Sequence, residues 1–594
     1  MKKNFIFTIY ALAIAVFFIL TGAFSVGSVN MPKTYWLSTV AADGHGDIED
    51  SYITVDLDRS FTVTDANGET ITENKAISGI YVYVGKIYDK SADDLTILFD
   101  FKTKSSSSTS YVKEVKASGV RQYSWYCVYD GSKDGLIDNW SRVKIHTPDV
   151  FEFYEVAFTA ENGERIKIER VAEYSEYTKT SAEYLIDEQS TFTSSAAYRF
   201  NLGDEELLEL KAADSLFKGE GEVGTGPFTT FLNAISIAVF GRNTFGIRFV
   251  SLLFGYISFI VLYLLIKRIF NSDVYALIGS LAALFMSALF ISSASASLSV
   301  GVAFILLAYY LAIGFYAGIY KFEYKKETVF NLIFSGLAIG FAVSCGVSNI
   351  IFLIGIPIVW GMSLKKLNSE YKVAYDEAKG LKKESIYTAY HKKTSRYGYL
   401  LPLAFIVIPL VLTVIFYAVS ASPVKAHYGT GFIGAMLRDM GSSFGFDFSI
   451  GRLGIFIGKD GNVLLNYVPY VAALIGFIFT TSLFFAPKNS KAHKMQSGIK
   501  VKYTILTIML VFGFAPFLFG LANHTAAAFF SCVYAAYIPL LLAAIGKVAK
   551  KKALIITTAV IGAIGLITFV GCYIGICGFE VSDALAKILY GWQI

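Results

Sequence analysis

The chain has 594 residues, of which 54% are hydrophobic and 16% aromatic, and its mean hydropathy is +0.51. This composition excludes a soluble globular protein. The 52 basic and 47 acidic residues leave a net charge of +5, too small an excess to indicate nucleic-acid binding.

Apolar segments long enough to cross a bilayer recur along the chain. A spanning helix needs about 20 mostly apolar residues. The sequence predicts eleven such spans: Phe5–Phe24, Phe245–Leu265, Val274–Ile291, Leu298–Ile319, Val329–Ser344, Asn349–Met362, Leu400–Ser420, Tyr467–Phe485, Tyr503–Leu521, Ala526–Ala544 and Ala553–Ile576. Residues 1–28 also fit a signal peptide, but an apolar run of about 18 residues favours a retained first span. Either alternative exports the segment that follows.

Basic residues between the spans predict the orientation. Lys2 and Lys3, Lys267 and Arg268, and the segment 365–396 with nine Lys/Arg against four Asp/Glu all fall on one side if the eleven spans are real. Cytoplasmic loops are rich in Lys and Arg. The expectation is a multi-pass protein of the cell membrane with a cytoplasmic N-terminus.

Residues 29–190 are polar and have the pattern of β-strands. Apolar and polar residues alternate in several short runs, and Phe151–Val171 predicts a hairpin that turns at Asn162-Gly163. We expect an extracytoplasmic antiparallel β-sandwich of the jelly-roll type inserted after the first span. The alternating runs are Ser51–Asp58, Ile80–Gly85, Leu95–Asp100 and Val143–His146.

Two functions stay open for this predicted sandwich. Its phrases Tyr-Ile-Thr-Val-Asp-Leu and Tyr-Glu-Val-Ala-Phe-Thr-Ala-Glu-Asn-Gly resemble discoidin-like, galactose-binding-type domains, and the resemblance implies glycan binding at one end. The alternative is a spacer whose Trp125 and Trp140 lie in the core, where most aromatic residues of a sandwich are found.

The segment 191–244 predicts an acidic loop and interfacial helices ahead of the multi-span part, 245–594. Asp204 and Glu205 precede an amphipathic run with Leu207 and Leu210 on one face. Acids in a first turn stabilise a helix by complementing its dipole. They also suit glycosyl transfer, because a carboxylate can take the proton of an acceptor hydroxyl.

The order and register of this acidic pair, Thr225-Gly226-Pro227-Phe228 and the span after position 244 resemble the protein O-mannosyltransferase family. This family belongs to the GT-C glycosyltransferases, which use lipid-phosphate sugars, and the chain resembles a divergent member of it. The resemblance implies Asp204 as general base of an inverting transfer from a polyprenyl-phosphate sugar and Glu205 as a supporting acceptor-binding carboxylate. It also implies that Arg248, at the outer end of its span, binds the lipid phosphate, and the alternative is an interfacial arginine that only anchors the helix.

Several family groups are missing from this chain. The family's histidine one turn after the acids is Leu208, the imidazole of its Thr-His-Pro-Pro motif is replaced by Gly226, and its Thr-Lys-Trp aligns with Ser344-Cys345-Gly346. Each loss removes a group that could hold sugar or phosphate. The six histidines have no metal-ligand spacing, so no metal is expected, and the lipid-linked donor is a substrate and not a cofactor.

Two functions therefore remain open for the whole chain. The first is transfer of a sugar, mannose by resemblance, to a protein Ser/Thr or a glycan hydroxyl on the extracytoplasmic side. The second is a catalytically inactive paralogue that binds glycans or forms membrane complexes. The expected partners are the membrane, a lipid-linked sugar and a protein or glycan acceptor, and no nucleic acid. Homo- and hetero-oligomers both stay open. A transporter is disfavoured, because the predicted spans contain almost no ionisable residues.

Overall fold

A computed structural model provides the structure of the chain. It describes residues 5–24, 30–38, 40–42, 48–58, 60–64, 70–74, 76–88, 95–103, 111–117, 119–120, 122–138, 140–147, 149–173, 180–194, 202, 204–218, 226–286, 299–319, 326–428, 467–485, 491–518 and 523–545. The chain divides into a helical unit, Met1–Gly27, Gly203–Gly241 and Phe245–Ile594, and a strand-rich unit, Ser28–Leu202 with Arg242–Thr244.

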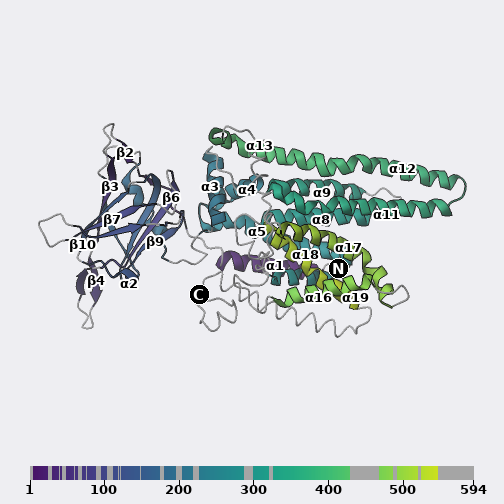
Figure 1. The fold of residues 1–594 in the computed structure, drawn as a ribbon, viewed down its shortest axis with the longest axis horizontal. Helices are drawn as coiled ribbons and strands as arrows, with labels where there is room; N and C mark the ends of the chain where they lie inside the picture. Colours follow the sequence, from purple (N-terminus) through teal and green to yellow (C-terminus); the bar gives the residue numbers. More distant parts are fainter. Residues whose placement is uncertain are drawn as a thin grey trace. The chain divides into compact units, whose positions relative to one another are not determined.

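The helical unit is that of a polytopic membrane protein. Seven of its described helices are long and apolar enough to cross a membrane. Its main helices are α1 (Phe5–Phe24), α3 (Asp204–Lys218), α4 (Pro227–Phe240), α5 (Thr244–Phe270), α6 (Asp273–Phe285), α8 (Ser299–Gly318), α9 (Lys326–Ser344), α10 (Ile350–Leu353), α11 (Gly355–Glu377), α12 (Leu381–Pro402), α13 (Ile408–Tyr428), α16 (Tyr467–Phe484), α17 (Lys491–Leu518), α18 (Asn523–Ala535) and α19 (Tyr537–Ile545) (Figure 1).

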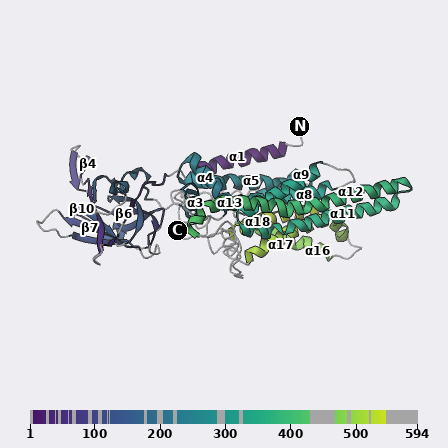
Figure 2. The same ribbon diagram turned by 90° about the horizontal axis from the view of Figure 1, so that it is seen from above.

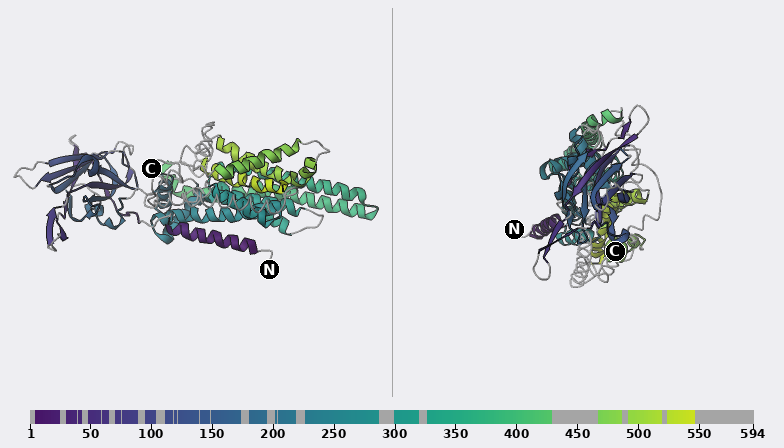
Figure 3. Two further views of the ribbon diagram at one scale, coloured as in Figure 1. Left: turned by 90° about the horizontal axis from the view of Figure 1, so that it is seen from below. Right: turned by 90° about the vertical axis from the view of Figure 1, so that its left-hand side faces the viewer.

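Ten of the eleven predicted spans fall on these helices, and the eleventh, 553–576, lies outside the described residues. The count of eleven therefore stays a prediction. The first span coincides with α1, the purple helix that lies along the helical unit in Figure 3. It packs on α5, where the stacked rings of Tyr10 and Tyr263 have centroids 4.8 Å apart.

The basic segment 365–396 is helical, where the sequence analysis expected a loop. Helix α11 continues to Glu377, the chain turns at Gly380 with φ +58°, and α12 begins at Leu381. The two helices run side by side in both views (Figures 1 and 2). Tyr371 and Tyr390 stack across them with ring centroids 3.9 Å apart. This tertiary contact, absent from the local pattern, explains why the helices extend beyond their apolar parts.

The strand-rich unit contains two antiparallel sheets that share one core. One has the strand order β1-β11-β6-β9, with β12 paired to β11, and the other β13-β3-β10-β7-β8, with β2 paired to β3, while β4 and β5 form a separate hairpin. The strands are β1 (Trp36–Leu37), β2 (Val40–Ala42), β3 (Ile48–Leu57), β4 (Ser60–Thr64), β5 (Thr70–Asn74), β6 (Gly79–Ile87), β7 (Ile97–Thr103), β8 (Tyr111–Ala117), β9 (Trp125–Asp130), β10 (Trp140–Thr147), β11 (Phe151–Thr159), β12 (Arg165–Ile166) and β13 (Ile168–Glu173).

Alternate residues of both sheets build the core, as the sequence pattern predicts. Ile53 and Val55 of β3 and Val82 and Val84 of β6 are fully buried members of one hydrophobic cluster. Two facing sheets with a common core form a β-sandwich. Its extracytoplasmic location and its likeness to discoidin domains stay predictions.

The predicted hairpin over Phe151–Val171 is only partly correct. Strand β11 pairs with β12 around a turn in which Gly163 has φ +78°, as Asn-Gly predicts. The chain then crosses to the other sheet, where β13 pairs with β3. The apolar alternation is the same on both strands, so the sequence could not indicate the crossing.

The two tryptophans differ in their environment. Trp140 is buried in the core, as the spacer alternative expects. Trp125 is half-buried on β9, donates from Nε1 to the Thr191 carbonyl at 2.9 Å and packs edge-on against Phe192.

Candidate active site

Helix α3 begins at the predicted acidic pair. Asp204 and Glu205 occupy its first turn, and their side chains lie outside the described part of the structure. Leu207 and Leu210 are buried, as the amphipathic pattern predicts, and Leu208 is exposed. The backbone therefore places Asp204 at a helix N-terminus, where the helix dipole favours a negative charge.

Arg248, near the start of α5, forms a buried ion pair with Glu206 of α3. Its Nε donates to Glu206 Oε1 at 2.7 Å and its Nη2 to Oε2 at 2.8 Å. The Arg248 side chain is 0% exposed and that of Glu206 is 2% exposed. Two parallel hydrogen bonds between a guanidinium and a carboxylate fix both distance and orientation. The pair thus joins α3 to α5 two residues after Asp204.

A second buried carboxylate of α3 reaches a different helix. Glu209 is 0% exposed and accepts hydrogen bonds from Thr230 Oγ1 at 3.2 Å and Asn233 Nδ2 at 3.3 Å, both on α4. Thr230 and Asn233 are themselves buried. Helix α3 is therefore attached to both α4 and α5 through side chains one turn apart.

Two of the segments that align with family motifs meet in space. Gly226, before α4, lies so close to Cys345 that an added Cβ would overlap the Cys345 carbonyl and lie 2.9 Å from the Gly346 nitrogen. No side chain fits at position 226 without movement of the backbone. At the position where the family carries a histidine, this chain has a glycine, and the backbone of Cys345 occupies the space that a side chain would need.

Phe228, two residues after Gly226, packs into an aromatic cluster next to this contact. Its ring lies 4.9 Å from that of Phe341 and 4.7 Å from that of Phe416, and it is 8% exposed. These rings come from α4, α9 and α13, so the segment at Gly226 rests on a packed aromatic cluster.

Glu206 and Glu209 are not among the site residues that the sequence predicts. Their signal was the spacing of three residues, which puts both carboxylates on one helix face, together with buried Leu210. A glutamate on an apolar face needs a partner. The partner Arg248 lies 42 residues away, and no local pattern identifies it.

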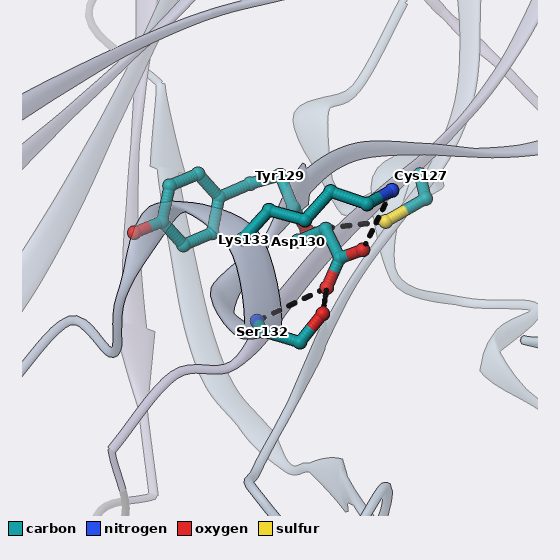
Figure 4. Close-up of polar contacts among 5 residues, drawn as sticks. All are labelled: Cys127, Tyr129, Asp130, Ser132 and Lys133. Atoms are coloured by element: carbon teal, nitrogen blue, oxygen red, sulfur yellow. Dashed lines mark hydrogen bonds and ion pairs between the residues drawn. The ribbon is translucent and has the colours of Figure 1, made fainter.

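Cys127 of the strand-rich unit is an exposed thiol next to a helix cap. Its Sγ donates to the Tyr129 carbonyl at 3.1 Å (Figure 4). Although the residue is exposed, the sulfur itself is partly shielded from water, and this desolvation raises the pKa of the thiol. Asp130 caps the short helix α2 (Gly131–Asp134) by accepting from Ser132 N at 3.1 Å and Ser132 Oγ at 2.7 Å, and these bonds hold its pKa below the usual range (Figure 4). A thiol with a raised pKa is a weak nucleophile, so this cluster is not a catalytic candidate.

Residues 224–371 match the dolichyl-phosphate-mannose-protein mannosyltransferase family. This stretch begins two residues before Gly226, ends within α11 and includes Gly226, Arg248 and Cys345. The match confirms the resemblance to lipid-phosphate-dependent glycosyltransferases over this stretch. It does not include Asp204 and Glu205.

Solved structures give a weaker likeness. The apo oligosaccharyltransferase of Archaeoglobus fulgidus has a TM-score of 0.36 at 14% identity, over 68% of this chain and 54% of its own. ArnT from Cupriavidus metallidurans, bound to undecaprenyl phosphate, has a TM-score of 0.38 at 12% identity, and the match covers 65% of this chain and 70% of ArnT. Arabinosyltransferase EmbB from Mycobacterium smegmatis has a TM-score of 0.32 at 9% identity, and the match covers 95% of this chain and 55% of EmbB. This chain spans about half the length of the archaeal enzyme. No curated protein matches the sequence.

Proposed function

We propose that the chain transfers a sugar from a polyprenyl-phosphate carrier to a hydroxyl group. The observation that supports this most is the family match over residues 224–371, which covers α4, α5 and the segment at Cys345. The sugar is mannose and the acceptor a protein Ser/Thr or a glycan, by the same resemblance. Transfer takes place on the extracytoplasmic side of the cell membrane, the side to which the acidic segment is predicted to be exported.

Asp204 is the general base of this reaction. The helix dipole stabilises a negative charge at a helix N-terminus, and a carboxylate there can take the acceptor proton as the hydroxyl attacks the sugar carbon. The bond from that carbon to the phosphate breaks, and the lipid phosphate leaves from the opposite face, so the configuration inverts. Glu205 holds the acceptor.

Arg248 is the proposed ligand of the lipid phosphate, since guanidinium groups bind phosphate with two parallel hydrogen bonds. In the structure, Glu206 occupies Nε and Nη2 of this guanidinium. A phosphate at these two nitrogens would therefore have to replace the Glu206 carboxylate.

The second candidate is a catalytically inactive paralogue. It is favoured by the close approach of Gly226 to Cys345, which leaves no space for the imidazole that the family carries there. Such a protein would bind glycans or assemble with other membrane proteins without turning over a lipid-linked sugar.

Turnover with defined carriers separates the two candidates. The purified full-length chain is incubated with polyprenyl-phosphate mannose, glucose and arabinose, each with and without a Ser/Thr peptide, and released sugar and glycosylated peptide are measured. Transfer or hydrolysis of any donor supports the enzyme. Its absence for every donor, from protein that is folded by thermal shift, supports the inactive paralogue.

A further inference from the structure

The buried face of α3 carries two carboxylates, each attached to a different helix. Glu206 contacts Arg248 of α5, and Glu209 contacts Thr230 and Asn233 of α4. The two glutamates are 2% and 0% exposed. Leu210, next to Glu209, shows that leucine fits on this face. The choice of glutamate at these positions needs an explanation other than apolar packing.

Stability does not provide that explanation. Removing two charges from water costs more than their attraction in the interior generally returns, and apolar side chains of similar volume often replace a buried ion pair without loss of stability. A bidentate pair does, however, fix the rotation and the height of one helix against another, because both hydrogen bonds depend on direction. Apolar contacts would allow α3 to slide or rotate.

We infer that Glu206 is a positioning residue, which acts through Arg248 to hold the first turn of α3 in register with α5 for the transfer reaction. Glu209 attaches the next turn to α4 and so prevents rotation about the first contact. This inference rests on the transfer reaction and the base of the proposed function, since the first turn of α3 carries Asp204 and Glu205. It assigns Arg248 a positioning role through Glu206 in place of direct binding of the donor phosphate. A displacement of about 1 Å of a reacting group can reduce the rate about 10²-fold.

This role differs from direct phosphate binding in its kinetic signature. If Arg248 acts through Glu206, loss of either partner lowers kcat and leaves the KM for the donor unchanged. If Arg248 is instead a ligand of the donor phosphate, Arg248→Met raises the donor KM while Glu206→Gln does not.

The test uses the full-length chain in lipid nanodiscs. The variants are Glu206→Gln, Arg248→Met and the apolar double variant Glu206→Leu/Arg248→Met. The matched control is Lys267→Met/Asp273→Asn, which removes a partly exposed ion pair of 2.7 Å between the opposite end of α5 and α6 and keeps an acceptor for the Tyr263 hydroxyl. Three quantities are measured: the unfolding temperature, hydrogen exchange of the peptide 204–218, and kcat and donor KM with the best polyprenyl-phosphate sugar.

The double variant is expected to unfold within a few degrees of the wild type. Its α3 peptide should exchange about tenfold faster or more, and its kcat should fall about 10²-fold at an unchanged donor KM. The control should match the wild type in exchange and in kcat. Should the double variant fail to fold, the isosteric Glu206→Gln is decisive, with the same direction of change in exchange and kcat.

Unchanged exchange at α3 in Glu206→Gln and in the double variant would overturn the inference, and so would a rise in donor KM confined to Arg248→Met. Failure of the proposed function is distinguishable. A wild type without turnover, whose exchange at α3 still depends on Glu206, overturns the enzyme while the attachment of α3 to α5 stands.

Discussion

The Glu155 carboxylate on β11 accepts a hydrogen bond from the backbone N–H of Glu188 at 2.6 Å and another from the Gln189 side-chain amide. Glu155 is 0% exposed, although it belongs to the outer face of its sheet. The short helical segment η4 (Gln189–Thr191) is thus tied to β11 through one buried acid. The pKa of Glu155 is raised to about 8, mainly by burial and in part by the nearby Asp187, although the two hydrogen bonds act in the opposite direction.

This raised pKa predicts that the strand-rich unit becomes less stable as the pH rises. Below the ordinary pKa of 4.5, Glu155 is protonated in the folded and the unfolded state and carries no penalty. Between pH 4.5 and about 8 the folded state binds more protons, so the free energy of unfolding falls with a slope of up to about 1.4 kcal/mol per pH unit. This pH dependence is measured by thermal unfolding of the full chain from pH 5 to 8.5.

Glu155→Gln should remove most of this dependence, because the amide has no proton to lose. The control is Glu164→Gln, which changes an exposed acid in the turn after β11. Equal pH dependence in the wild type and in Glu155→Gln would show that Glu155 is not the titrating group.

A second prediction concerns the close approach at Gly226. Gly226→Ala should destabilise the helical unit by about 1–3 kcal/mol, because the new methyl group overlaps the Cys345 carbonyl and the backbone must shift. Gly361→Ala in α11 is the control, since an added Cβ there meets nothing within 4 Å. It should be neutral or stabilising by about 0.5–1 kcal/mol. Unfolding in mild detergent measures both.

If Gly226→Ala were more stable than Gly361→Ala, the segments at Gly226 and Cys345 would not be in contact in the protein. The same experiment bears on function. Gly226→His restores the family's residue type, and by this argument it should be less stable than Gly226→Ala and gain no transfer.

The sequence predicts most of the secondary structure, because the two-residue alternation of a strand and the continuous apolar run of a spanning helix are both local patterns. Strand β3 and helix α1 each follow from a run that can be read without its neighbours. The extension of α11 and α12 through 365–396 could not be predicted, because it depends on the stacking of Tyr371 on Tyr390. Contacts between residues far apart in the chain cannot be recognised from a local pattern.

The candidate site shows the same limit. The start of α3 at Asp204 follows from an acidic first turn before an amphipathic run. The Arg248 side chain was expected at an interface with lipid phosphate, and its buried partner Glu206 was not foreseen. Which charges pair depends on how α3 and α5 pack, and this information is spread over the whole unit.

A third prediction tests the orientation of the chain. A reporter inserted after Gly380, in the turn between α11 and α12, should be cytoplasmic, because the flanking segment 365–396 carries nine Lys/Arg against four Asp/Glu. One inserted after Asn162, in the turn between β11 and β12, should be extracytoplasmic. Both sites lie in turns, so neither insertion interrupts a helix or strand. Reporters on the same side would contradict the predicted topology.

The last prediction decides whether Asp204 acts as the base. Asp204→Asn keeps the shape of the side chain and removes the proton acceptor, so transfer should fall by about 10²–10⁴-fold. The unfolding temperature should change little, since an acid in the first turn of a helix contributes only about 0.3–1 kcal/mol through the dipole. Asp214→Asn, on the same helix but away from its first turn, is the control and should retain activity. Initial rates with the best lipid-linked donor measure the effect, and full activity of Asp204→Asn would assign the base to another residue.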